Sequence, residues 1–338
     1  MVGVQNIFPP TKETVMRKFM MGILGAAASV AIMPASANAA CGAVSITEMN
    51  WASAQVVTAV SKFLMEQGYG CKVTVVPSAT VTATASLVEN GKPDIATELW
   101  LNGAPAVVKL IKSGKAVDLG KVLSDGGIEG WYLPKYLVDK HPELAKIEGV
   151  LANPKLVGGM FHQCPEGWGC KIANTSLAKA MDIEAKGLKI FVHGSGETLA
   201  TSLASAYSEK KPWFGYYWEP TAILGKYDMV RVDFGVTDVA IHKCNADVKC
   251  EKVGISNFPP SPVHTITTKD FAAREPAVIA LMKNVSFTNK EMGAVLAWKK
   301  DKKASSQDAA VHFLTSYKDK WSKWINADAK KKLAALLK

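Results

Sequence analysis

The sequence lacks the features that several large protein classes require. After residue 40, no apolar run approaches the roughly 18 residues that a membrane-spanning helix needs. Glycine-rich phosphate-binding loops are absent. The stretch Gly194-Ser195-Gly196 is not a G-x-S-x-G nucleophile elbow, because His193 stands two residues before the serine. We therefore expect a protein that is not an enzyme and has no cofactor, with a secreted enzyme as a remote alternative.

Signals for metal and nucleic-acid binding are missing as well. No C-x-x-C or H-x-x-x-H spacing accompanies the cysteines, so a zinc site is not expected. The formal net charge is +10, but the lysines gather in helical stretches such as 299–303 and 330–332. Acidic residues are interleaved with the basic ones, and no basic–aromatic repeat is present. This pattern predicts a solvated surface, with no nucleic-acid partner.

The N-terminal segment is typical of an export signal. Met16-Arg17-Lys18 precedes an apolar run over residues 19–33, and small residues follow up to residue 39. This order predicts a secretory signal peptide and a periplasmic product. Asn38 stands where a lipoprotein signal has an apolar residue, which argues against a lipid anchor at Cys41.

All six cysteines follow the predicted cleavage site. An even number of cysteines in an oxidising compartment predicts three disulfides, and the sequence alone allows 15 pairings. The spacings favour three of them: Cys41–Cys71, Cys164–Cys170 and Cys244–Cys250.

Strand and helix patterns alternate along the chain. In the first part they predict strands over residues 43–51, 72–77 and 94–100 and helices over 52–67 and 82–90. After residues 126–131 the alternation restarts, with helices over 174–181 and 197–209 and strands over 188–192, 212–220 and 263–268. The remainder reads as helical, including an amphipathic stretch over 309–324. This order is typical of open α/β sheets, which bind ligands at the carboxyl ends of their strands.

The pattern predicts an α/β fold with two lobes, of the type II-like periplasmic binding protein class, with the ligand in the cleft between the lobes. Residues 1–39 are expected to be an upstream extension and the signal peptide. We expect the first lobe to comprise residues 41–130 and 262–338, and the second to comprise residues 131–261.

The loop from Cys164 to Cys170 is the most distinctive motif. It reads Cys-Pro-Glu-Gly-Trp-Gly-Cys, so a disulfide between its ends would close a tight loop that presents Trp168. Glycines on both sides of Trp168 leave the indole faces and the neighbouring N–H groups open to a ligand. From the loop alone, a tryptophan with a purely structural role, packed under a surface loop that the disulfide holds in place, is as good an interpretation as ligand binding.

Two further motifs support the ligand interpretation. Trp100 ends a predicted strand, and the segment 216–220 reads Tyr-Tyr-Trp-Glu-Pro. Together with the 164–170 loop, these motifs resemble those of the glycine betaine/proline betaine-binding proteins of ABC importers, including their choline-binding relatives. The resemblance extends over nearly all of the mature sequence. One departure is Glu219, where the family pattern has a neutral residue.

The resemblance implies a set of ligand-binding residues. In this family, tryptophans at these motifs form an aromatic box around a quaternary ammonium, which implies Trp100, Trp168 and Trp218 here. The backbone N–H groups of Gly169 and Cys170 would then take the ligand carboxylate. Trp51, at the end of the first predicted strand, is expected as a fourth wall on weaker motif support.

Several other residues have two interpretations. His264 is either a ligand contact or a structural histidine. Glu98 and Glu219 adjoin box tryptophans, where they either add negative potential near the cation or lie in solvent or bond an indole N–H. Of the remaining tryptophans, Trp131 and Trp213 stay undecided, whereas helical spacing predicts packing roles for Trp298, Trp321 and Trp324.

The sequence therefore predicts a monomeric periplasmic substrate-binding protein that delivers a methylated zwitterion to an ABC permease at the inner membrane. Glycine betaine, proline betaine and dimethylsulfoniopropionate all carry a diffuse cation and a carboxylate. Choline or carnitine is one alternative ligand class, and an amino acid or a polyamine in the same fold is another. Trimethylammonium cannot donate a hydrogen bond, so aromatic faces are the groups suited to recognise it.

Overall fold

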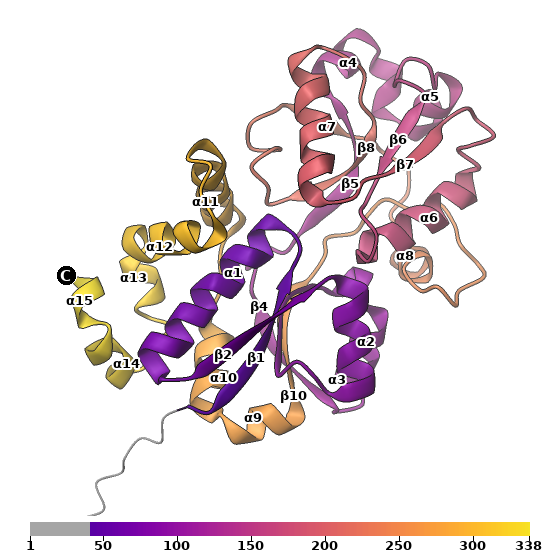
Figure 1. The fold of residues 1–338 in the computed structure, drawn as a ribbon. Helices are drawn as coiled ribbons and strands as arrows, with labels where there is room; N and C mark the ends of the chain where they lie inside the picture. Colours follow the sequence, from indigo (N-terminus) through magenta and orange to yellow (C-terminus); the bar gives the residue numbers. More distant parts are fainter. Residues whose placement is uncertain (1–40) are drawn as a thin grey trace, which may run out of the picture. The chain divides into compact units, whose positions relative to one another are not determined.

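Two sheets of five strands each form the framework of the structure, which is a computed structural model (Figure 1). It describes residues 41–338; the predicted extension and signal peptide lie outside the described residues. The first sheet has the strand order β2-β1-β3-β10-β4 and the second has the order β7-β6-β8-β5-β9. The predicted two-lobed α/β fold is confirmed, with one sheet in each lobe.

The first sheet is mixed, with two parallel and two antiparallel strand pairings. Strand β1 pairs parallel with β2 and β3, and β10 pairs antiparallel with β3 and β4. All six residues of β3 are buried, as expected for a central strand covered on both faces. The strands are β1 (Ala43–Met49), β2 (Lys72–Ser78), β3 (Ile95–Trp100), β4 (Ala116–Lys121) and β10 (Val263–Thr268).

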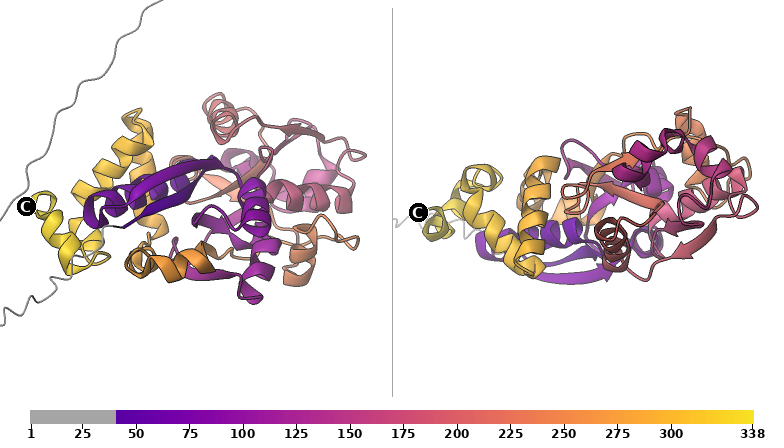
Figure 2. Two further views of the ribbon diagram at one scale, coloured as in Figure 1. Left: turned by 60° about the horizontal axis from the view of Figure 1, so that its bottom comes forward. Right: turned by 90° about the horizontal axis from the view of Figure 1, so that it is seen from above.

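Helices cover both faces of this sheet. Helix α1 packs against α11 and α12, and α2 lies beside α3 (Figures 1 and 2). The helices are α1 (Ala52–Phe63), α2 (Thr80–Asn90), α3 (Pro105–Lys112), α9 (Lys269–Arg274), α10 (Pro276–Asn284), α11 (Asn289–Asp301), α12 (Ser306–Ser316), α13 (Lys318–Trp321), α14 (Ala327–Lys332) and α15 (Ala334–Leu337). A π-helical turn, η1 (Leu64–Gly68), continues α1, and a 3-10 turn, η2 (Leu101–Gly103), follows β3.

The second sheet mixes both strand directions. Strand β6 pairs parallel with β7 and β8, and β5 pairs antiparallel with β8 and β9. Its strands are β5 (Ile128–Pro134), β6 (Met160–Gln163), β7 (Lys189–Val192), β8 (Gly215–Glu219) and β9 (Met229–Arg231). Its helical elements are α4 (Lys135–Lys140), η3 (Pro142–Ala145), α5 (Ile147–Ala152), α6 (Gly169–Met181), α7 (Gly196–Ser208) and α8 (Val239–Asn245).

The chain passes between the sheets twice, after β4 and before β10. At the crossings Gly127 and Ser261 exchange two backbone hydrogen bonds, at 2.8 and 2.9 Å, so the two connecting segments are paired with each other. The predicted lobe boundaries run close to this pairing; as exact limits they stay a prediction. Among the described residues, no helix is both long and apolar enough to cross a bilayer.

Some element boundaries differ from those predicted. The amphipathic stretch over 309–324 is not one helix, because Tyr317, between α12 and α13, leaves helical geometry with φ −121° and ψ 40°. Helix α6 begins at Gly169, five residues before the predicted start at Asn174. Trp168 precedes it in an extended conformation, with φ −82° and ψ 143°. The early start places the glycine and cysteine of the predicted carboxylate site in the first turn of a helix.

Candidate functional site

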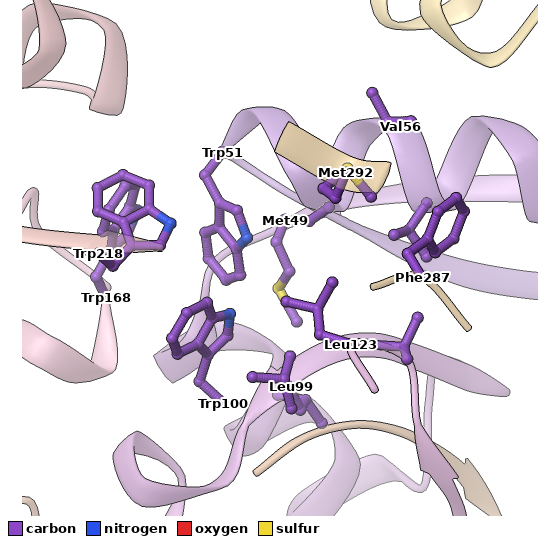
Figure 3. Close-up of a cluster of buried hydrophobic side chains, with 14 of the residues drawn as sticks. Met49, Trp51, Val56, Leu99, Trp100, Leu123, Trp168, Trp218, Phe287 and Met292 are labelled. Carbon is purple, nitrogen blue, oxygen red and sulfur yellow. The ribbon is translucent and has the colours of Figure 1, made fainter. Parts of the chain in front are cut away.

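Four tryptophans border one cavity of about 30 Å³ between the two sheets. Trp51 precedes α1 and Trp100 ends β3, whereas Trp168 precedes α6 and Trp218 lies in β8. Figure 3 shows the rings of Trp51 and Trp100 facing those of Trp168 and Trp218. The remaining lining residues are Thr80, Gly103, Glu129, Gly169, Cys170 and Tyr216. We call the four indoles the tryptophan box.

Three rings of the box, those of Trp51, Trp168 and Trp218, meet edge to face. The Trp51 and Trp168 centroids are 5.3 Å apart at 71°, and those of Trp168 and Trp218 are 5.1 Å apart at 84°. Such arrangements place the positive edge of one ring against the negative face of the next. Each of the four side chains is at least nine-tenths buried, so the negative ring faces lie in a desolvated environment. A cation held there meets little competition from water.

A buried carboxylate, Glu98, holds the two tryptophans of the first lobe. Its Oε1 accepts from the Trp51 indole N–H at 2.7 Å and from the Trp100 indole N–H at 3.4 Å. The Ser53 hydroxyl also donates to this oxygen at 2.7 Å. The single oxygen therefore fixes the orientation of both indoles.

The backbone at Glu98 explains how its side chain reaches this position. Between the pairs His264–Leu99 and Ile266–Ala96 the register shifts, so β3 has one more residue than β10. Glu98 has φ 52°, in the left-handed region that non-glycine residues rarely adopt. Because of this bulge, the Glu98 side chain does not follow the regular alternation of side chains between the two faces of β3. Strain of this kind is typical of functional sites.

Burial raises the pKa of Glu98 to about 7, and its hydrogen bonds from Ser53, Trp51 and Trp100 only partly oppose that effect. The second carboxylate oxygen, Oε2, is buried and has no hydrogen-bond partner within residues 41–338. Near neutral pH, a cation in the box would favour the ionised form of this carboxyl.

A second buried carboxylate, Glu129, lies under the other half of the box and was not predicted from the sequence. Its register partner across β5 and β8 is Trp218, so both side chains point to the same face of the sheet. The Tyr216 hydroxyl donates to Glu129 Oε1 at 2.8 Å, and the Tyr216 ring stacks on Trp218 at 6.1 Å. Burial raises the pKa of Glu129 to about 7. Unlike Glu98, Glu129 lines the cavity itself.

The polar end of the cavity is the N-terminus of α6. Gly169 and Cys170 occupy its first turn, where N–H groups have no acceptor within the helix and the helix dipole favours an anion. The Cys164–Cys170 disulfide ties this turn to the end of β6. A Cβ on Gly169 would lie 2.5 Å from the Gly103 carbonyl oxygen, so this close approach of the two lobes requires a glycine.

Three further contacts join the lobes around the box. The Trp168 indole N–H donates to Asn50 Oδ1 at 2.7 Å, which links α6 to the loop before α1. The Val81 N–H donates to the Gly167 carbonyl at 3.0 Å. Trp100 lies against the chain crossing, since a Cβ on Gly127 would fall 2.0 Å from its ring.

Comparison with known families decides the class of this protein. A family described as the substrate binding domain of ABC-type glycine betaine transport systems matches residues 42–316. The chain belongs to this family. Its members are substrate-binding proteins of transporters and not enzymes. This confirms the predicted family and the prediction that the protein is not an enzyme.

Two curated relatives are glycine betaine/proline betaine-binding periplasmic proteins. The protein from Escherichia coli (strain K12) is 25% identical over 226 residues, which are 61% of this chain and 66% of that protein. The one from Salmonella typhimurium (strain LT2) is 24% identical over 196 residues, or 55% of this chain and 57% of that protein. The alignments thus span less than two thirds of each relative, at 66% and 57% of their lengths.

Solved structures show the same fold. A glycine betaine/L-proline-binding protein from Borrelia burgdorferi has a TM-score of 0.71 at 17% identity, covering 86% of this chain and 99% of that chain. A choline-binding protein in complex with choline has a TM-score of 0.70 at 17% identity, covering 88% and 99%. Lactococcal OpuAC in its closed, glycine betaine-bound form has a TM-score of 0.66 at 20% identity, covering 84% and 100%. At these identities the likeness supports the two-lobed fold alone.

Within this betaine-transport family member, all three predicted disulfides are present. The Cα atoms of Cys41 and Cys71 lie 4.4 Å apart, those of Cys164 and Cys170 6.3 Å apart, and those of Cys244 and Cys250 5.3 Å apart. The first joins the start of β1 to the start of β2, and the second pins the Trp168 loop. The third closes the loop after α8, whose Asp247 pairs with Lys109 of α3 at 3.3 Å.

The structure does not bring His264 to the cavity. Its Nδ1 lies 2.8 Å from Asp118 Oδ2, and it is not among the lining residues. Glu219, which ends β8, borders a different surface groove.

The tryptophans outside the box pack in the lobes. Trp131 is fully buried and donates to Asn174 Oδ1 at 2.8 Å, and Trp213 donates to Ser202 Oγ at 3.0 Å. Both therefore belong to the core. The sequence alone had left their roles undecided. The remaining three pack as predicted: Trp298 stacks on His312, Trp321 is fully buried, and Trp324 packs on Phe287 and Phe313.

Proposed function

We propose that this protein is exported to the periplasm, captures a small methylated zwitterion in the tryptophan box and delivers it to an ABC permease. Glycine betaine, proline betaine and dimethylsulfoniopropionate have the required chemistry. The observation that carries the proposal is the meeting of four indoles and a helix N-terminus at one cavity. The family match and the periplasmic relatives support it.

The box suits the cationic end of such a ligand. A trimethylammonium or dimethylsulfonium group spreads its charge over methyl groups and donates no N–H hydrogen bond. Each indole face contributes about 0.5–2 kcal/mol to binding such a cation when desolvated. Micromolar affinity requires about 8 kcal/mol, so four faces supply a large share of it. Burial of the methyl groups adds to this.

The first turn of α6 suits the anionic end. The N–H groups of Gly169 and Cys170 are positioned for charge-assisted hydrogen bonds to a carboxylate, and the helix dipole adds to them. The box and this turn border the same cavity, so one short molecule can occupy both.

Choline is the second candidate, and Glu129 is the observation that favours it. Choline has the same cation but carries a hydroxyl in place of the carboxylate. The Glu129 carboxylate lines the cavity and can accept a hydrogen bond from that hydroxyl. Against choline, the N–H groups of the α6 turn would then have no charged partner. We therefore expect carboxylated ligands to bind at least about tenfold more tightly than choline.

Titration calorimetry on the mature chain tests the proposal. The panel contains glycine betaine, dimethylsulfoniopropionate, choline, tetramethylammonium, arginine and putrescine. Tight binding of the two zwitterions, weaker binding of choline and weaker still of tetramethylammonium is the expected order. Choline binding as tightly as betaine would contradict the role of the α6 turn. Binding of arginine or putrescine with none by the methylated cations would overturn the box as the cation site.

A further inference from the structure

The tryptophan box adjoins a larger groove on one side. This groove has a volume of about 530 Å³ and is lined by α7 of the second lobe and by the C-terminal part of α11 of the first. Trp51 and Trp218 line both the groove and the box, so the two cavities meet at these indoles. Gly169 and Cys170, the proposed carboxylate site, line the box alone. The groove therefore lies on the side of the box away from the α6 turn.

Contacts between the lobes close other sides of the box. The Val81 N–H donates to the Gly167 carbonyl beside α2. A Cβ on Gly169 would lie 2.5 Å from the Gly103 carbonyl oxygen, so the chains are close there too. The paired chain crossings, against which Trp100 lies, close a third side.

The groove side is the one that reaches solvent. Trp168 meets both Trp51 and Trp218 edge to face, but within residues 41–338 no ring contact joins Trp51 to Trp218. Figure 3 shows Trp51 of the first lobe facing Trp218 of the second. Lys300 and Lys303, which line the groove, are exposed. The groove therefore connects solvent with the side of the box that Trp51 and Trp218 form.

The charged residues that line the groove are three lysines and one acid. Lys299 and Lys300 lie in the last turn of α11, and Lys303 follows it. The acid is Glu197, in the first turn of α7. Within residues 41–338, none of the three lysines forms an ion pair with an acid. The lining of the groove thus has a net positive charge.

The surroundings of Lys300 agree with a positively charged recess. Lysines in the last turn of a helix stabilise it through the helix dipole, which explains their position along α11 but not the groove that they border. Burial and the nearby charge of Lys226 lower the pKa of Lys300, and Asp301 only partly opposes them. This is the direction expected for an ammonium group that is partly desolvated beside another cation.

We propose that the groove is the route by which ligands reach the box, and that Lys299, Lys300 and Lys303 select against ligands with a net positive charge on this route. The inference rests on the proposed function and narrows its ligand class. Low-dielectric walls focus the field of the lysines along a cleft. Choline carries a full positive charge and is repelled. Glycine betaine is neutral overall, and its carboxylate is attracted first to the lysines and then to the α6 turn.

Stopped-flow measurements of tryptophan fluorescence on the mature chain test the charge selection. Association of choline and of glycine betaine is measured at about 20 mM and about 300 mM salt, between which screening differs strongly. At low salt, the variant Lys299→Gln/Lys300→Gln/Lys303→Gln should bind choline at least about threefold faster than wild type, with a much smaller change for betaine. At high salt, the difference between variant and wild type should shrink, because the lysine charges are screened.

The matched control replaces three lysines of α14, in Lys330→Gln/Lys331→Gln/Lys332→Gln. It removes the same charge, and these lysines line neither the groove nor the box. Choline should associate with this control as with wild type. An equal acceleration in the control would assign the effect to net charge and overturn the role of the groove lysines. Equal choline rates in wild type and the groove variant, or no choline binding by either, would overturn it as well.

A further variant tests the route itself. Ala204→Phe adds bulk where α7 lines the groove. It should slow association and dissociation of glycine betaine by similar factors and leave the affinity nearly unchanged, because the barrier changes and the bound state does not. Ala185→Phe is the control, since Ala185 is an exposed residue of the same lobe that does not line the groove. Unchanged rates in Ala204→Phe, or a loss of affinity at an unchanged association rate, would show that ligands enter elsewhere.

The salt dependence of the wild type keeps the test valid even if a variant folds poorly. Choline association should accelerate with salt, whereas betaine association should change little. Choline association that is constant or slows with salt would contradict the proposal. If the wild type binds neither ligand, the proposed function itself fails. If glycine betaine binds and the choline rates do not respond to the groove lysines, only the present inference fails.

Discussion

Trp51 and Trp100 are fixed within the first lobe, because both indole N–H groups donate to Glu98 of the same lobe. Trp168 differs, since its N–H donates across the cleft to Asn50. The first half of the box therefore keeps its geometry whether or not the lobes are together. The second half acquires part of its geometry only when they meet. If the box binds a cation as proposed, this difference would couple the shape of the cation site to lobe closure.

The two halves also differ in where their buried acid lies. Glu98 stands behind the indoles of the first half, whereas Glu129 lines the cavity, faces Trp218 across the β5–β8 register and accepts a hydrogen bond from Tyr216, whose ring stacks on Trp218. Burial raises the pKa of both carboxyls to about 7. The first acid thus positions aromatic rings, and the second borders the cavity in which we propose that the ligand binds.

Removing a ring from the second half should have the largest effect. Trp168→Ala deletes a cation–π face, buried area and the hydrogen bond to Asn50. We expect ligand affinity to fall at least about a hundredfold, which is about 3 kcal/mol. Trp168→Phe keeps a π-face and should lose roughly tenfold. Calorimetry with glycine betaine measures both, with Trp298→Phe on α11 as the control. Equal losses for Ala and Phe would show that the π-face is not used.

Neutralising the acid of the first half tests its titration. Because the folded pKa of Glu98 is raised, the folded state holds its proton more tightly than the unfolded chain between about pH 4.5 and 7. This contribution to stability is full at low pH and is lost as pH rises through about 7. Glu98→Gln cannot ionise. Its stability relative to wild type should therefore increase between pH 5 and 8, by on the order of 2–3 kcal/mol.

Urea unfolding of both proteins at pH 5 and 8 measures this difference. The comparison with the variant is needed because burial lowers the pKa of His162 and His242 to about 4, which acts in the opposite direction over the same range. That contribution is common to both proteins and cancels. A stability difference that is equal at the two pH values would mean that Glu98 does not titrate between them.

Local signals made much of the site predictable. The cysteine spacings identified all three disulfides: Cys164–Cys170 and Cys244–Cys250 each close a short loop of sequence separation 6, and Cys41 and Cys71 are the two cysteines that remain. The tryptophans met at one cavity because Trp51 and Trp100 end neighbouring segments of one sheet. The alternation of strands and helices along the sequence was sufficient to predict the two-lobed α/β fold.

The buried acids show where the sequence was insufficient. The position of Glu98 under two indoles depends on a bulge opposite β10, a strand about 165 residues later in the chain. Glu129 meets Trp218 through antiparallel register across β5 and β8, which a single sequence does not encode locally. The start of α6 at Gly169 was missed because a glycine-rich loop is a poor helix predictor.

Crowding Trp100 should have a smaller effect than removing Trp168. The Cβ of Gly127→Ala would fall 2.0 Å from the Trp100 ring, so the ring or the chain crossing must move. We expect affinity for glycine betaine to fall roughly tenfold, about 1.4 kcal/mol. Gly194→Ala is the matched control, because nothing lies within 4 Å of its added Cβ. If calorimetry finds the two variants alike, Trp100 has room to adjust and the first half is less rigid than inferred.

The smallest effect should come from the contact that joins the halves. Asn50→Ala removes the acceptor of the Trp168 N–H but leaves all four rings in place. A hydrogen bond of this type contributes about 0.5–1.5 kcal/mol, so affinity should fall only roughly three- to tenfold. Asn50→Ala should affect lobe closure more than cation binding, because the hydrogen bond between Asn50 and Trp168 also joins the two lobes.

Scattering and calorimetry together separate these two consequences of Asn50→Ala. Without ligand, the variant should have a larger radius of gyration than wild type, and saturating glycine betaine should return it to the wild-type value. Asn153→Ala is the control, since the Asn153 side chain donates to the Gly149 carbonyl of its own lobe, at 3.0 Å. If Asn50→Ala loses affinity while its radius matches that of wild type in both states, the bond orients Trp168 without affecting closure. The coupling between the second half of the box and the lobes would then be refuted.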